Sequence, residues 1–215
     1  MQRARRILDR DGKRRLVDNH SWNHHDRRAG SGNTNLAFID LYPYFDLLWR
    51  GEGFSNNTPP DFWLIERSGI AFGIAGEMLG RGNPFRGQLF GMTDRAGWGG
   101  GPDGLWKFID EVKLGDAELL GWWDDACPVR VTGEADVKAS VWKGKTHTVL
   151  VVANFARQPR TATFAFDALK LGFDGTKAAW SLPEIDPFQK AGGAPDFTKP
   201  VEVPAEGGFI LAVSK

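Results

Sequence analysis

Cysteine, net charge and long apolar runs are what this 215-residue sequence has least of. Its single cysteine, Cys127, excludes an intrachain disulfide. Because Cys127 precedes a proline and has no obvious histidine partner in sequence, we expect a buried structural thiol rather than a nucleophile. The formal net charge of +0 gives no signature of binding to nucleic acid or to a membrane surface. No stretch reaches ~18 apolar residues, so no transmembrane helix is expected.

The N-terminus also lacks the apolar segment of a signal peptide, although it is rich in positive charge. Seven of the first fifteen residues are Arg or Lys. We interpret them as the end of a basic helix over residues 2–10 rather than as a nucleic-acid-binding arm. A turn at Asp11-Gly12 and a short strand over residues 15–20 are expected to follow.

Aromatic and acidic side chains are concentrated between Asp40 and Phe54. The apolar run from Leu36 to about Tyr42 predicts a buried strand. Glu52 follows it, placed between two glycines that allow close approach of a ligand, with Trp49 nearby. A sugar stacks its C–H face on an aromatic ring and offers its hydroxyls to carboxylates, so this pattern indicates a sugar site. The alternative is a turn after a strand, with the aromatic rings in the core.

Residues 41–54, with the sequence LYPYFDLLWRGEGF, resemble a motif of bacterial glycoside hydrolase family 123-like proteins. The resemblance continues through residues 60–73 and 82–95 and reaches residues 121–128. It implies a glycosidase built as a (β/α) barrel followed by a β-sandwich. It further implies activity on N-acetyl-β-galactosaminides, with the substrate's own N-acetyl group as nucleophile. The acid and orienting carboxylates would then lie on an earlier barrel strand, which we expect this chain to lack.

Helical periodicity dominates the first part of the chain. A helix over about 62–68, capped by Asp61, and an amphipathic helix over 103–112 are predicted. The adjacent acids Asp110 and Glu111 belong to a solvated face of the second helix. The apolar run 88–92 predicts another buried strand, while residues 70–79 fit a strand or a helix equally.

The period changes to two after a hinge near residues 121–128. Alternating segments at 137–142 and 161–166 and the apolar run 148–154 predict an antiparallel sheet. The expected fold class is therefore α/β plus all-β. The resemblance implies that residues 1–126 form the C-terminal part of a (β/α) TIM-type barrel that carries the site loops. The alternating segments predict that residues 127–215 form an accessory antiparallel β-sandwich.

Candidate site residues follow from this arrangement, because ligands bind at the carboxyl ends of barrel strands. The catalytic candidates are Glu52 and Asp46. Arg50 and Arg86 are candidates for binding an acidic sugar, with a salt bridge to a carboxylate as the alternative. The expected substrate-binding residues are His20, Trp22, Asn23, Asp40, Tyr44, Trp49, Arg50 and Trp98.

No metal or cofactor is expected. The three histidines between residues 20 and 25 match no strong zinc pattern, and no cysteine joins them. The glycines of residues 97–101 are not set between a strand and a helix, as a dinucleotide fingerprint requires.

Three functional hypotheses remain. The first is the C-terminal fragment of a glycoside hydrolase, inactive by itself, because the chain opens in the middle of a β/α unit. The second is a non-catalytic carbohydrate-binding protein, and the third a structural domain that packs on a partner. The expected ligand is an oligo- or polysaccharide, without nucleic acid or membrane. The compartment is undefined, and an exported full-length protein would carry its signal before Met1.

Overall fold

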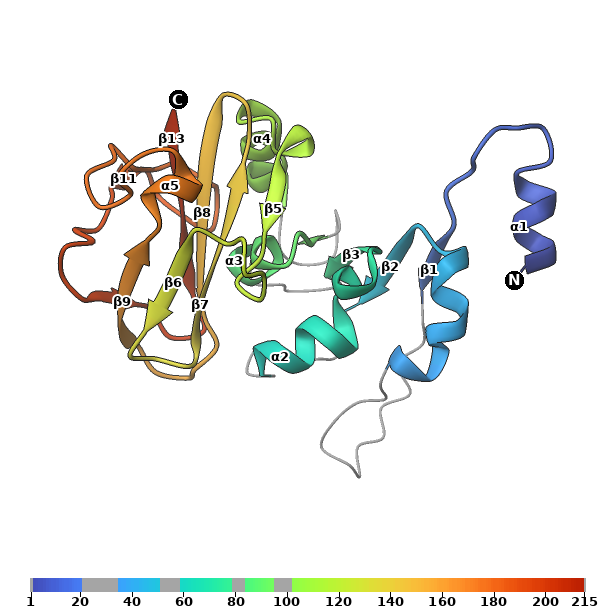
Figure 1. Ribbon diagram of the computed structural model, residues 1–215, viewed down its shortest axis with the longest axis horizontal. Coiled ribbons are helices and arrows are strands. Elements are labelled where there is room, and N and C mark those ends of the chain that lie inside the picture. Colours follow the sequence, from blue (N-terminus) through green and yellow to red (C-terminus); the bar gives the residue numbers. More distant parts are fainter. Residues whose placement is uncertain (1, 21–34, 51–58, 79–83, 95–101, 215) are drawn as a thin grey trace.

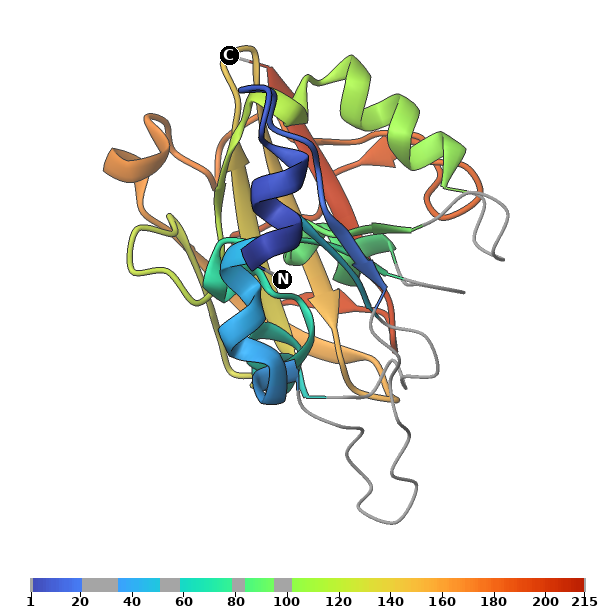
Figure 2. The ribbon, with the colours of Figure 1, turned by 90° about the vertical axis from the view of Figure 1, so that its right-hand side faces the viewer.

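A computed structural model describes residues 2–20, 35–50, 59–78, 84–94 and 102–214. It contains a small parallel sheet beside a larger β-sandwich, with helix α1 (Gln2–Leu8) at the outer end of the parallel sheet (Figure 1). Seen from that end, α1 lies in front of the parallel sheet and the sandwich lies behind it (Figure 2). The predicted N-terminal helix is therefore confirmed, and so is the strand that follows it, although that strand is shorter than expected. Within the described ranges no helix is both long and apolar enough to cross a membrane.

The parallel sheet has the order β1-β2-β3-β4, so strands adjacent in sequence are also adjacent in space. All three pairings are parallel. Its strands are β1 (Asp18–His20), β2 (Leu47–Arg50), β3 (Ala75–Met78) and β4 (Thr93–Asp94). Parallel neighbours need a crossover connection, which is usually helical. The connecting helices are η1 (Asn35–Tyr44), α2 (Pro60–Phe62) continued by η2 (Trp63–Arg67), η3 (Ile70–Phe72) and α3 (Pro84–Leu89).

Two predicted strands are wrong for one common reason. The run from Leu36 to Tyr42 forms the 3-10 helix η1, and the run from Gln88 to Met92 covers the end of α3 and a turn. Both runs lie between parallel strands, where the chain must cross over and return. A short helical segment and a buried strand can show the same continuous apolar run, so periodicity alone could not separate them.

The helix predicted over 62–68 is present but begins earlier, at Pro60. Proline suits a first helical position because its missing N–H would have no partner inside the helix. Asp61 is therefore inside the helix and does not cap it; Pro59 stands at the cap position and makes no side-chain cap hydrogen bond. The predicted cap is wrong, while the helix itself is confirmed.

The sandwich packs a large antiparallel sheet against a small one. The large sheet has the order β11-β10-β13-β8-β7-β5 and the small one β12-β9-β6. The apolar layer between them is formed by alternate residues of both sheets, such as Val141, Leu150, Phe164 and Leu211. The predicted antiparallel sandwich is confirmed. Its strands are β5 (Glu118–Leu120), β6 (Val129–Thr132), β7 (Val137–Lys143), β8 (His147–Asn154), β9 (Arg160–Phe166), β10 (Ser181–Leu182), β11 (Gly192–Gly193), β12 (Val201–Val203) and β13 (Gly208–Ser214), and a short helix α5 (Ala168–Leu171) follows β9.

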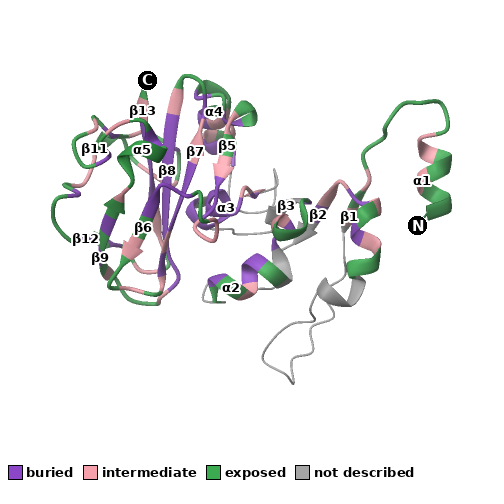
Figure 3. Ribbon diagram, in the orientation of Figure 1, coloured by how far each residue is buried: buried purple, intermediate pink, exposed green. Residues whose placement is uncertain are grey.

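The large sheet is buried on both faces, which explains why β8 is buried at every position after His147 and continuously apolar from Val149 to Ala153. On the face turned away from the small sheet, Val149, Val151 and Ile210 pack against Phe90 after α3 and Phe108 of α4 (Asp103–Glu111). Figure 3 shows this burial along β7 and β8, in contrast with the exposed α1. The amphipathic helix predicted over 103–112 is thus confirmed, with Asp110 and Glu111 exposed as expected.

Helix α3 is also joined to the large sheet by polar contacts. The carbonyl of Leu89 accepts a 2.9 Å hydrogen bond from the Ser140 hydroxyl, and the carbonyl of Gln88 accepts a 3.1 Å hydrogen bond from the Trp142 indole. The last carbonyls of a helix have no hydrogen-bond donor inside the helix, and here two side chains of β7 are the donors. The sandwich and the helical layer therefore share one core and one set of hydrogen bonds.

The sandwich sheet begins before the hinge that the sequence suggested. Strand β5 precedes residue 127 and pairs antiparallel with β7, from Glu118 opposite Lys143 to Leu120 opposite Val141. The boundary at residues 126 and 127 stays a prediction. Cys127 itself is buried, as predicted, and burial raises the pKa of its thiol. Among the described residues the parallel strands form an open sheet, and no closed barrel is seen.

Candidate functional site

The carboxyl ends of the four parallel strands define the candidate site. They lie at His20, Arg50, Met78 and Asp94. Ligands of parallel α/β sheets and barrels bind at this edge. The chain segments that follow these ends, residues 21–34, 51–58, 79–83 and 95–101, contain Trp22, Asn23, Glu52 and Trp98, and these four predicted site residues lie outside the described residues.

The strand register brings together two predicted residues that are far apart in sequence. His20 at the end of β1 is the register partner of Trp49 in β2. Trp49 in turn pairs with Glu77 of β3, and Glu77 pairs with Thr93 of β4. These four positions form one row across the sheet, with neighbouring strands about 4.8 Å apart. Arg50 pairs with Met78 and belongs to the next row.

Glu77 and Thr93 are not among the site residues predicted from the sequence. Residues 70–79 fitted a strand or a helix equally, so no strand end was assigned there. The signal that could have found Glu77 is a carboxylate at the end of an apolar run that is followed in sequence by Gly80 and Gly82. The residues beside Glu77 in the sheet are set by the parallel pairing of β3 with β2 and β4, and the composition of the sequence does not reveal that pairing.

Thr93 is held in place by α4. The indole nitrogen of Trp106 donates a 2.6 Å hydrogen bond to the Thr93 hydroxyl. Both side chains are half-buried. This contact fixes the last position of the row against the helix that packs on the sandwich, so the strand ends do not depend on the parallel sheet alone.

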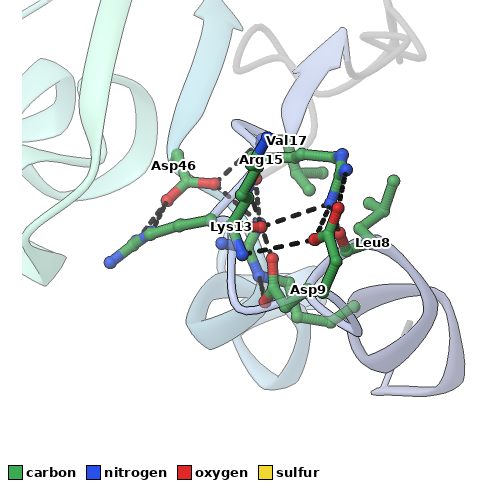
Figure 4. Close-up of polar contacts among 9 residues, drawn as sticks. Leu8, Asp9, Lys13, Arg15, Val17 and Asp46 are labelled. Atoms are coloured by element: carbon green, nitrogen blue, oxygen red, sulfur yellow. Dashed lines mark hydrogen bonds and ion pairs between the residues drawn. The ribbon is translucent and has the colours of Figure 1, made fainter.

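The structure places Asp46 at the opposite, amino end of β2 (Figure 4). Its carboxylate accepts hydrogen bonds from the Val17 backbone N–H at 2.8 Å, the Arg5 guanidinium at 2.9 Å and Arg14 Nε at 3.0 Å. Its own N–H donates to the Val17 carbonyl at 2.9 Å. Burial acts to raise the pKa of Asp46, but the Val17, Arg14 and Arg5 hydrogen bonds outweigh it and the pKa is lowered.

These contacts give Asp46 a structural task. Helix α1 has no buried residue, so Arg5 and Asp46 are its tie to the sheet. A catalytic part for Asp46 stays a prediction. Arg50 lies four positions further along the chain, which is about 13 Å in an extended strand.

Asp40 and Tyr44 also come before β2 rather than after it. Both belong to η1, where Asp40 is exposed and Tyr44 half-buried. They were predicted to lie at the end of a strand, and the helical path of η1 removes that reason for grouping them with Glu52. Their part in sugar binding stays a prediction, as does that of His20, Trp49 and Arg50, whose backbones alone are described.

Arg86 of α3 is a core residue in this structure, with 2% of its surface exposed. Its guanidinium lies 4.4 Å from the Trp63 ring centroid and 4.5 Å from that of Phe155. Burial lowers its pKa to about 9, although Glu206 opposes that shift. Stacking between two aromatic rings stabilises a guanidinium that has left water. We therefore assign Arg86 to the packing of α3 on the sandwich. In the part of the chain that is described, no three metal-ligating side chains come together.

Comparison with known proteins agrees with this architecture. Residues 1–97 match the family described as glycoside hydrolase 123, TIM-barrel domain, and residues 101–214 match glycoside hydrolase 123, C-terminal domain. No curated protein matches the sequence.

Among solved structures, a noncanonic maltogenic alpha-amylase from Thermotoga neapolitana superposes with a TM-score of 0.53 at 12% identity. The match covers 100% of this chain and 58% of the amylase chain, so this chain spans little more than half the length of that structure. A GH30 endoxylanase from Clostridium papyrosolvens (12% identity, 100% of this chain and 70% of that one) and an Anoxybacillus alpha-amylase (9%, 97% and 54%) give TM-scores of 0.40 and 0.43, which add no support.

The amylase match supports the fold alone, whereas the two family matches together take in the parallel sheet and the sandwich. The chain belongs to glycoside hydrolase family 123.

Proposed function

We propose that this protein takes part in the hydrolysis of O-glycosidic bonds, with N-acetylhexosaminides as the substrate class that the family favours. The observation that carries the proposal is the register of β1 and β2. His20 and Trp49, chosen independently as sugar contacts, are register partners at the carboxyl edge of the sheet. Glu52 follows three residues after Trp49, in the segment that leaves this edge.

We further propose that the four parallel strands are the last strands of a (β/α) barrel, followed by its accessory sandwich. Their sequential order and uniformly parallel pairing support this, since a barrel of eight such strands is built in that way. The match of residues 1–97 to a TIM-barrel domain supports it as well. The strands needed to close the barrel would carry the other carboxylates of the reaction, and this chain would supply one wall of the site.

Hydrolysis of a glycosidic bond requires a general acid beside the oxygen of the bond that breaks. A protonated carboxyl group donates its proton to the bridging oxygen while the C1–O bond breaks and its electron pair goes to that oxygen. The N-acetyl oxygen of the substrate closes on C1 from the other face, and water later opens this ring and regenerates the carboxyl proton. Glu52, three positions after Trp49 in the sequence, is our candidate in this chain for a carboxylate that acts in this step, as the acid or by binding a sugar hydroxyl.

The test is turnover of 4-nitrophenyl glycosides by the complete gene product, with Glu52→Gln as the variant. The panel contains the β-N-acetylgalactosaminide, β-N-acetylglucosaminide, β-galactoside and β-glucoside. Loss of an acid catalyst should lower kcat by roughly 10²- to 10⁴-fold. Glu202→Gln is the matched control, because Glu202 is exposed in the middle of β12. Unchanged turnover in Glu52→Gln overturns the role of Glu52.

The same panel separates the other functions. Sugar binding without turnover, lost on Trp49→Ala, would identify a non-catalytic carbohydrate-binding protein. Absence of both binding and turnover would leave a structural domain that packs on a partner. Isothermal titration of the 215-residue chain with N-acetylgalactosamine and N-acetylglucosamine supplies the binding measurement.

A further inference from the structure

Glu77 lies in β3, which has a parallel strand on each side, β2 and β4. Its register partner on one side is Trp49 and on the other Thr93. His20 lies beyond Trp49 in the same row. The row therefore places a carboxylate between an aromatic residue and a hydroxyl residue, one residue before the end of β3.

The row that precedes it fixes the face on which Glu77 lies. Leu48, paired with Gly76, is fully buried in a cluster with Tyr42 and Phe45 beneath the connecting helices. A Cβ on Gly76 would come 2.6 Å from the Ser68 carbonyl of that same helical layer. Successive residues of a strand fall on opposite faces. Glu77 thus belongs to the face turned away from the connecting helices, which in a (β/α) barrel is the inner face.

The other carboxylates of the described sheet have different positions. Asp18 opens β1 at the amino end, paired with Leu47. Asp94 pairs with Met78 in the next row, on the face of Leu48. Asp46 precedes β2 and is held by Arg5 and Arg14. Within the described strands, Glu77 is therefore the carboxylate that shares a row and a face with the two predicted sugar contacts.

We propose that Glu77 binds two neighbouring hydroxyl groups of the sugar ring that stacks on Trp49, and so determines which sugar is accepted. This inference rests on the proposed glycosidase function. An ionised carboxylate only accepts hydrogen bonds and has two oxygens, which suits a pair of vicinal hydroxyls. Hydrogen bonds to a charged group are about twice as strong as neutral ones. Glutamate is depleted in strands, so its presence in β3 is unusual for the strand alone.

The experiment compares the complete gene product with its Glu77→Gln and Glu77→Ala variants, using the best substrate of the 4-nitrophenyl panel and its monodeoxy analogues. Wild type should discriminate against the analogues that lack the recognised hydroxyls by about 10- to 100-fold in kcat/KM. Both variants should lose kcat/KM by a similar factor, chiefly through KM, and Glu77→Ala should no longer discriminate. Glu202→Gln should behave like wild type.

The discrimination between substrate and analogue is the decisive readout, because a merely structural glutamate would lower turnover of all of them equally. If Glu77→Ala does not fold, the nearly isosteric Glu77→Gln is tested in its place, by the ratio of kcat/KM for the substrate to kcat/KM for each monodeoxy analogue. Unchanged kcat/KM and unchanged discrimination overturn this inference while wild-type turnover upholds the proposed function. A wild type that neither hydrolyses nor binds any sugar of the panel overturns both.

Discussion

The indole nitrogen of Trp106 lies 2.6 Å from the hydroxyl oxygen of Thr93. Trp106 belongs to the part of the chain that matches the C-terminal domain of the family, and Thr93 to the part that matches the barrel domain. One hydrogen bond thus joins the sandwich side of the molecule to the end of β4. It does so at the row of strand positions that contains Trp49 and Glu77.

Removing this hydrogen bond should cost about 1 kcal/mol of unfolding free energy. The variants Trp106→Phe, Thr93→Val and their combination, measured by urea unfolding, form a double-mutant cycle. Because each single change removes the same contact, the two effects should not add. Additive losses would show that the side chains do not interact in solution.

Asp46→Asn should release the N-terminal segment without unfolding the sandwich. Helix α1 buries no residue, and the charge of Asp46 holds both Arg5 and Arg14. We expect a loss of about 1–3 kcal/mol in local stability. Hydrogen exchange of residues 2–17 is the measurement, with β8 as internal reference. Asp116→Asn, at an exposed aspartate of η4 (Leu114–Asp116), is the control. Unaltered protection over residues 2–17 would contradict the assignment.

The same carboxylate gives the N-terminal segment an acid sensitivity. The pKa of Asp46 is lowered in the folded protein, so its stabilising effect is complete above the unfolded value of about 3.9. That effect is lost as the pH falls through the folded pKa. Between about pH 5 and pH 2, wild type should lose protection over residues 2–17 while Asp46→Asn, already without the charge, changes less. If wild type and Asp46→Asn lose protection over residues 2–17 at the same pH, the acid sensitivity does not come from Asp46.

Gly208→Ala should destabilise the sandwich by about 3 kcal/mol, since overpacking forces the backbone to move. A Cβ at Gly208 would stand 2.0 Å from the carbonyl oxygen of Val152 and 2.9 Å from Cβ of Phe85. Gly193 in β11 is the matched control, because nothing lies within 4 Å of a Cβ there. Thermal unfolding of Gly208→Ala and Gly193→Ala measures the difference, and equal melting temperatures would disprove it.

The Gln189 side chain pairs with β13 at Ile210, beyond the single position, Ser181 opposite Ala212, at which the short strand β10 pairs with it. Its Oε1 accepts from the Ile210 N–H at 2.8 Å, and its Nε2 donates to the carbonyls of Ile210 at 2.9 Å and Pro183 at 2.8 Å. Gln189→Glu would put a carboxylate against two carbonyl oxygens and should cost about 1–3 kcal/mol. Gln158→Glu, at an exposed position, should cost much less. Urea unfolding at pH 7 compares them, and similar midpoints would argue against the pairing.

The sandwich could be predicted from sequence because its signals are local. Alternation at residues 137–142 and 161–166 and the amphipathic pattern of 103–112 each report one exposed and one buried face. The parallel sheet was harder, because its connecting helices are short and apolar. Residues 36–42 and 88–92 therefore looked like strands, and β2 was missed at Leu47–Arg50.

The candidate site shows the same limit. Glu52 was chosen for its own neighbours in sequence, but the row that contains Glu77 exists only through the register of separate strands. Asp46 looked like a site carboxylate because it shares a short stretch with Glu52. Its partners Arg5 and Arg14 lie far away in the chain, and only folding brings them to it.

The core that α3 shares with β8 and β13 has a consequence for recombination between relatives. The boundary between the two family matches, near residue 100, falls after α3. Phe85 and Phe90 lie before this boundary, yet they share a core cluster with Val151 and Ile210, which lie after it. A chimera that keeps this sandwich and takes the part before residue 100 from a relative would set a foreign helix on the sheet. Ser140 and Trp142 would then lose the Leu89 and Gln88 carbonyls to which they donate. A junction between β3 and α3 would transfer the helix together with the sheet that completes it.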